Sequence, residues 1–236
     1  MIVTRVPQWI PPVLTLDNYR TALEKASIFR WLMNSTLIAA ITTILVLLID
    51  AMAAYAFARL NFFGRDFMFA VVLATLMVPG QVTIIPLYLF FNDLELLDTY
   101  PAVILPRLAA AIGVFMLRQF FLSIPGELEE AARIDGCSRY GIFWRIILPL
   151  ARPSLTALAI FTLVWSWNDF MWPLIALSSK EMYTLPVGIS TLVGYYARDW
   201  GMQMAGAFLA SAPVLVLFLF FQREFIKGIA MTGLKG

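Results

Sequence analysis

The sequence predicts an all-α membrane protein with about five transmembrane helices. Of its 236 residues, 61% are hydrophobic and only 14% are charged, whereas soluble domains carry about a quarter charged residues. The apolar residues gather in charge-poor runs of about 20 residues, the length that a helix needs to cross the roughly 30 Å apolar core of a bilayer. Backbone groups in lipid must be satisfied within their own segment, and this requirement selects helices.

Five runs are expected to be spans, at about residues 31–58, 67–91, 99–117, 154–177 and 200–222. Pro79 and Gly80 interrupt the second run, which indicates a kink followed by a separate helix over residues 81–91. A broken helix at membrane depth either lines a cavity or packs within protein, and both explanations stay open here. Residues 178–199 are expected to form a mixed external loop.

Residues 1–30 are expected to form an external N-terminal arm ahead of a transmembrane domain at residues 31–236. The first 20 residues lack a continuous apolar core and are broken by Pro7, Pro11 and Pro12, a pattern not expected of a signal peptide.

Composition excludes several classes of function. The chain has one cysteine, Cys137, and no histidine, which excludes an internal disulfide, a zinc site and histidine acid–base catalysis. The net charge of +2 is too small to indicate a nucleic-acid partner. The phosphate-binding pattern G-x-x-x-x-G-K-[ST] does not occur, so we expect neither ATP hydrolysis nor a bound cofactor in this chain.

A polar segment with a compact turn lies between the third and fourth runs, within about residues 118–153. Glu127, Glu129 and Glu130 are expected to open a short helix, because carboxylates are favoured at the positive end of the helix dipole. Gly136 can adopt the left-handed conformation that ends a helix. A second short helix with one apolar face is expected after it, stopped by Pro149 and Pro153. Its apolar positions are Tyr140, Phe143, Trp144, Ile147 and Leu148.

The residues Glu130-Ala131-Ala132, then Asp135-Gly136, then Ile147-Leu148-Pro149 after ten more positions, make this segment similar to the "EAA" loop of membrane subunits in ATP-binding cassette importers. The resemblance extends from about residue 15 to residue 236 and is strongest to the maltose-type second permease of sugar importers. It includes the runs RWLMNS (30–35) and MVPGQVTIIPLY (77–88). Compared with that family, the usual first helix is expected to be missing.

The resemblance implies that residues 127–149 couple the chain to an ATPase subunit. Glu130 would anchor the first helix of the loop, and Ala131 and Ala132 would allow close approach to the ATPase. Asp135 and Gly136 would set the bend, while Ile147, Leu148 and Pro149 would tie the loop to the fourth span. The alternative is an ordinary amphipathic surface helix with a glycine cap.

The family also implies partners and an orientation. The partners are a second permease subunit, a pair of ATPase subunits that bind the ATP, an extracytoplasmic sugar-binding protein and the lipid bilayer. If the loop is cytoplasmic, ten of the 17 basic residues lie on its side of the cell membrane, as the positive-inside rule requires. The C-terminus would then be cytoplasmic too.

Polar groups within the spans mark a candidate substrate path. A charge at a helix centre costs about 2.5–3.5 kcal/mol on insertion scales, so such groups usually face a bundle interior or water. Asn168 and Asp169 lie in an aromatic run with Trp167 and Trp172 that suits sugar binding, or alternatively an aromatic belt at the outer interface. Arg107 either reaches the outer surface or pairs with an acid, or it lines the path.

The expected function is therefore the permease subunit of an ATP-driven sugar importer. An importer of the same class for another solute (a polyol phosphate, an amino acid or a peptide), an ion-coupled secondary transporter and a non-transporting scaffold remain alternatives. Asp169 alone gives the ion-coupled alternative a thin basis.

Overall fold

The computed structural model describes residues 15–25, 27–195 and 200–233, and over these residues the chain is all-helical. The expected all-α fold is confirmed. Residues 1–14 of the expected arm and the terminal residues 234–236 lie outside the described residues. The helices of the first half are α1 (Asp17–Lys25), α2 (Ile28–Arg59), α3 (Arg65–Ala74), η1 (Thr75–Met77), α4 (Ile84–Asp93), α5 (Tyr100–Ile104), η2 (Leu105–Arg107) and α6 (Ala111–Ser123). Those of the second half are α7 (Glu127–Ile134), α8 (Arg139–Ile142), η3 (Phe143–Ile147), α9 (Leu148–Leu150), α10 (Arg152–Asn168), α11 (Met171–Ala176), α12 (Leu185–Tyr195) and α13 (Trp200–Gly233).

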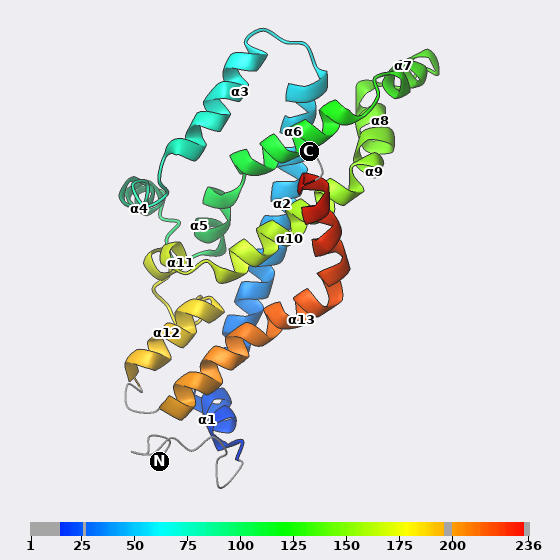
Figure 1. The fold of residues 1–236 in the computed structure, drawn as a ribbon. Helices are drawn as coiled ribbons and strands as arrows, with labels where there is room; N and C mark the ends of the chain where they lie inside the picture. Colours follow the sequence, from blue (N-terminus) through cyan, green and yellow to red (C-terminus); the bar gives the residue numbers. More distant parts are fainter. Residues whose placement is uncertain (1–14, 26, 196–199, 234–236) are drawn as a thin grey trace.

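Helix α2 extends from the end of the molecule that holds α1 to the opposite end, where the chain turns into α3 (Figure 1). It packs mainly against α6 and α10. Ala51, Ala54 and Ala58 are buried at this contact, and small residues let helix backbones approach closely where lipid offers no hydrophobic driving force. The largest buried cluster lies here and continues into the polar segment, so the loop and the spans share one core.

Among the described residues, only α2 is by itself long and apolar enough to cross a membrane. Two bent pairs also qualify when each pair is taken as one span: residues 100–107 with 111–123, bent by 44°, and residues 139–150 with 152–168, bent by 77°. Residues 84–93 and 200–216 form shorter apolar helices. The count of five spans stays a prediction.

The second expected span is broken, as Pro79 and Gly80 indicate: α3 and η1 end at Met77, and α4 begins at Ile84. The third is broken as well, which the sequence analysis did not anticipate. Residues 108–110 separate η2 from α6, and Ala109 adopts a left-handed conformation with φ +61°.

Two other segments differ from expectation. Residues 185–195, expected in a loop, form α12, in which Gly188 lies directly against Trp31 of α2. Residues 17–25 of the expected arm form α1, which packs on α13. Both helices lie at the end of the molecule opposite α7 (Figure 1).

The run RWLMNS at the start of α2 holds the segment before α12. The Trp31 indole donates to the Lys180 carbonyl at 2.8 Å, and the Asn34 amide donates to the carbonyls of Glu181 and Tyr183 at 2.8 and 2.9 Å. Trp31 and Asn34 therefore have a structural role, because they hold the segment before α12 against the start of α2.

Candidate functional site

The polar segment folds as two short helical units with a tight turn between them. Helix α7 carries three glutamates in its first turn and ends in a Schellman motif. Gly136 has φ +80°, its amide donates to the Arg133 carbonyl at 3.0 Å, and the Cys137 amide donates to the Ala132 carbonyl at 2.9 Å. The expected helix and glycine turn are confirmed.

The second unit runs continuously through α8, η3 and α9 from Arg139 to Leu150. The Ser138 hydroxyl caps it by accepting from the Gly141 amide at 3.2 Å. The expectation that Pro149 stops this unit is wrong, because Pro149 lies within α9. The break falls at Ala151, and Pro153 begins α10 rather than ending a helix, since proline suits the first turn.

The inner face of the segment belongs to the main core. Ala132, Ile142, Phe143 and Ile147 are buried with residues of α2, α6 and α10. The Ala132 methyl group thus packs inside this chain, and the expected close approach of an ATPase at Ala131 and Ala132 stays a prediction. Ile147 does tie the loop to the spans, and Leu148 packs partly against the same core.

The outer face exposes large apolar side chains. Ile134 is 86% exposed and Tyr140 81% exposed, and Trp144 and Leu128 are about half exposed. A run of apolar side chains with so much exposed area on a polar loop marks an interaction surface. Tyr140 and Trp144 are exposed while Phe143 and Ile147 are buried, so the second unit has apolar side chains on its outer side as well, where one apolar face was expected.

The remaining predicted loop residues border this outer face. Glu130, Ala131, Asp135, Gly136 and Pro149 are exposed. Glu130 lies in the first turn of α7, and its expected anchoring role stays a prediction, whereas the buried carboxylate of α7 is that of its neighbour Glu129, which is 3% exposed.

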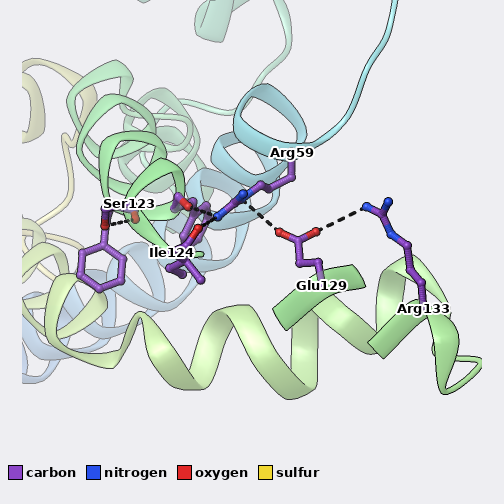
Figure 2. A network of polar contacts seen from close by, with 7 residues as sticks. Arg59, Ser123, Ile124, Glu129 and Arg133 are labelled. Atoms are coloured by element: carbon purple, nitrogen blue, oxygen red, sulfur yellow. Dashed lines mark hydrogen bonds and ion pairs between the residues drawn. The ribbon is translucent and has the colours of Figure 1, made fainter. Parts of the chain in front are cut away.

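Glu129 joins α7 to the ends of two spans. Figure 2 shows its carboxylate between Arg59, the last residue of α2, and Arg133 of α7. Its Oε1 lies 3.1 Å from Nε of Arg59, and its Oε2 lies 3.7 Å from Nη2 of Arg133. Arg59 also donates to the carbonyls of Phe121 and Ile124 at the end of α6. This network was not predicted, although the last basic residue of a span and an acid in the loop are both present in the sequence.

A second charged cluster lies where two spans break. Arg107 at the end of η2 donates to Oδ2 of Asp169, just after α10, at 2.5 Å. Its guanidinium carbon lies 4.4 Å from the ring centre of Trp165, whose side chain is half exposed. The structure therefore brings two of the predicted path residues together, and the pairing of Arg107 with an acid is confirmed. Trp165 belongs to the same aromatic run as the predicted Trp167 and Trp172.

The other predicted path residues lie elsewhere. Trp167 and Trp172 are buried and donate to the carbonyls of Ala210 and Ala102, at 3.4 and 2.8 Å. Their burial argues against direct contact with a solute. Asn168 is exposed, and its side-chain amide donates to the Val164 carbonyl of the same helix at 2.8 Å. Over the described ranges, no group of three or more His, Cys, Asp or Glu is placed to hold a metal ion.

Comparison with known proteins decides the family. Residues 51–229 match the family described as the binding-protein-dependent transport system inner membrane component. The chain belongs to this family. It is thus a transport permease and an inner membrane component, and the ion-coupled and scaffold alternatives lose their support.

Individual relatives agree with this assignment. The chain is 45% identical over 227 residues to the arabinooligosaccharides transport system permease protein AraQ of Halalkalibacterium halodurans, covering 96% of this chain and 81% of the relative. AraQ of Bacillus subtilis is 42% identical with the same coverage. The sn-glycerol-3-phosphate transport system permease protein UgpE of Brucella abortus is 35% identical, covering 94% of this chain and 84% of the relative.

A solved structure supports the fold. A chain of a bacterial ATP-binding cassette transporter involved in the import of the acidic polysaccharide alginate superposes with a TM-score of 0.82 at 23% identity, over 94% of this chain and 84% of that chain. At this identity the likeness concerns the fold alone.

Proposed function

We propose that this chain forms half of the translocation pathway of an ATP-driven sugar importer and couples to an ATPase subunit through residues 127–149. One observation carries the proposal. The loop is fused to the spans by a shared buried core on one side and presents exposed Ile134, Tyr140 and Trp144 on the other. A docking element that must move the spans needs both properties.

The proposed assembly contains a second permease, two ATPase subunits that bind the ATP and an extracytoplasmic sugar-binding protein. In it, the α7–α9 loop and the C-terminus are cytoplasmic, and residues 1–30 lie outside as an arm before the membrane domain at residues 31–236. The loop between α2 and α3, with Arg59 and Arg65, lies at the same end of the molecule as α7 (Figure 1). Basic residues at this end support that orientation.

The loop acts as a lever in this proposal. When the ATPase pair closes on ATP, it pushes on the outer face of the segment from Glu130 to Gly136. Because Ala132 and Ile147 are packed with α2, α6 and α10, the push reaches the spans and switches the pathway from inward to outward opening.

Arg107, Asp169, Asn168 and Trp165 form the proposed solute contact. The half-exposed Trp165 ring offers a flat apolar face of the kind that stacks on sugars. The Asp169 carboxylate neutralises Arg107, so the site has no unpaired cation for a phosphate. This pairing favours an uncharged oligosaccharide, as in the name of AraQ, over a polyol phosphate, as in the name of UgpE.

The coupling role is tested by Gly136→Asp with Gly64→Asp as its matched control. Both glycines have a positive φ, +80° and +76°, and both have open space where a Cβ would stand, so backbone strain is alike. We expect Gly136→Asp to insert in the membrane but to abolish transport and association with the ATPase, because it adds a charge at the docking turn. Gly64→Asp should keep both.

The measurements are chain level in the membrane, copurification of the ATPase and uptake of labelled sugar. Normal binding-protein-stimulated ATP turnover in the Gly136→Asp variant would count against the lever.

A further inference from the structure

We infer that Arg59 and Glu129 are positioning residues that lock the coupling loop to the ends of α2 and α6, so that the three move as one body. The inference deepens the proposed function and rests on it. It adds to the buried packing of Ala132 a network of charged groups that ties α7 to the ends of α2 and α6.

Arginines join the ends of α2 and α6 to each other. The last carbonyl groups of a helix have no partner within it, and a cation there also complements the helix dipole. Arg59 of α2 donates to the Phe121 and Ile124 carbonyls at the end of α6, while Arg118 of α6 donates to the Phe57 carbonyl near the end of α2 at 3.3 Å. The two spans are therefore crosslinked reciprocally at the end that faces the loop.

The ion pair between Glu129 and Arg59 is largely buried. The Glu129 side chain is 4% exposed and that of Arg59 is 15% exposed, whereas Arg133 on the far side of the carboxylate is 54% exposed. An ion pair in such a place is costly to break, because removing one partner leaves the other charge buried without compensation. Arg59 is thus the main counterion of Glu129.

The Arg59 guanidinium lies where three segments of the chain meet. One planar guanidinium contacts three chain segments: the end of α2 that carries it, the end of α6 through two carbonyls, and α7 through Glu129 (Figure 2). Lysine carries a single ammonium and cannot reproduce this fork. The position therefore demands an arginine, and a displacement of α7 pulls directly on both spans.

The test measures the distance between spin labels at Cys137, the only cysteine of the chain, and at an introduced Asn61→Cys beyond the end of α2. It uses the full chain in lipid nanodiscs. We expect a narrow distance distribution in the parent and a clearly broader one in Glu129→Gln and Arg59→Met. The control Asp66→Asn neutralises the acid of an exposed pair with Arg65 at 2.9 Å and should leave the distribution narrow.

Coupling is measured on the importer complex as sugar transported per ATP hydrolysed. Glu129→Gln should lower this ratio at least tenfold while the ATPase still copurifies, which separates loss of positioning from loss of docking. Arg59→Lys keeps the charge and should give an intermediate broadening and ratio, so it decides the matter if the neutral variants do not reach the membrane.

A narrow distribution together with an unchanged ratio in Glu129→Gln or Arg59→Lys overturns the inference. If the parent chain binds no ATPase at all, the proposed function fails. The spin-label distances still show whether Arg59 and Glu129 hold α7 to the ends of α2 and α6.

Discussion

The molecule holds two arginine–carboxylate pairs that are built differently. Arg59–Glu129 has side chains 15% and 4% exposed, and two helix carbonyls and a second arginine complete its contacts. Arg107–Asp169 has side chains 24% and 12% exposed, joins two helix breaks and lies beside a half-exposed tryptophan. The first pair has the features of a fixed joint between helices, and the second those expected of the proposed solute contact.

The largest difference should appear when both charges of each pair are removed. Asp169→Leu alone leaves Arg107 uncompensated and should destabilise the chain by about 2–3 kcal/mol, somewhat less than a fully buried pair because both side chains are partly exposed. Arg107→Met/Asp169→Leu should restore chain level in the membrane but not transport. Arg59→Met and Glu129→Gln alone should lower the chain level without abolishing it, and Arg59→Met/Glu129→Gln should not restore that level, because the Phe121 and Ile124 carbonyls still lack Arg59 as a donor.

Chain level and sugar uptake in the four single and two double variants measure this. If chain level in the membrane recovers equally in both double variants, the proposed difference between the two arginine–carboxylate pairs is wrong.

A smaller effect is expected at Trp165. Trp165→Leu loses the ring face beside Arg107, worth about 0.5–1 kcal/mol for an exposed cation–π contact, and should raise the KM of transport several-fold with chain level unchanged. Trp165→Phe keeps an aromatic face and should retain most of the affinity. An unchanged KM in Trp165→Leu would make the second pair a structural contact like the first.

The smallest effect concerns a carboxylate outside both pairs. Partial burial of Asp98 would raise its pKa, but hydrogen bonds from the backbone amides of Ser179 and Ser178 outweigh burial and lower the pKa below its usual value. A lowered pKa stabilises the folded state above the unfolded value of about 4, and this contribution is lost as the pH falls through the folded-state pKa.

Asp98→Asn should therefore cost less than about 1 kcal/mol near pH 7 and nothing at acid pH, because the partly exposed group is screened by solvent. Asparagine tolerates the left-handed backbone at this position, where φ is +60°, so the turn is kept. Hydrogen exchange of the Ser178 and Ser179 amides, followed as a function of pH, measures this loss of stability. A cost that does not depend on pH would assign the effect to the backbone turn instead of the charge.

Local features of the coupling loop were accessible from the sequence. Acids at the start of α7 and glycine at position 136 act within one turn of helix, so residue type alone predicts them. Pro149 was misjudged for a local reason as well. The unit that begins at Arg139 passes through Pro149 and ends one residue later at Leu150, and residue type alone does not locate a helix end to a single position.

The apolar runs of the sequence determined that this chain is a helical membrane protein, because the length of a span and the need to satisfy its backbone are properties of each segment alone. Only the tertiary structure decided which acid of Glu129 and Glu130 is buried, since one residue along a helix turns the side chain by about 100°. It also decided that Arg107 meets Asp169 and Arg59 meets Glu129. Those pairs are 62 and 70 residues apart, and their contacts depend on how whole spans pack.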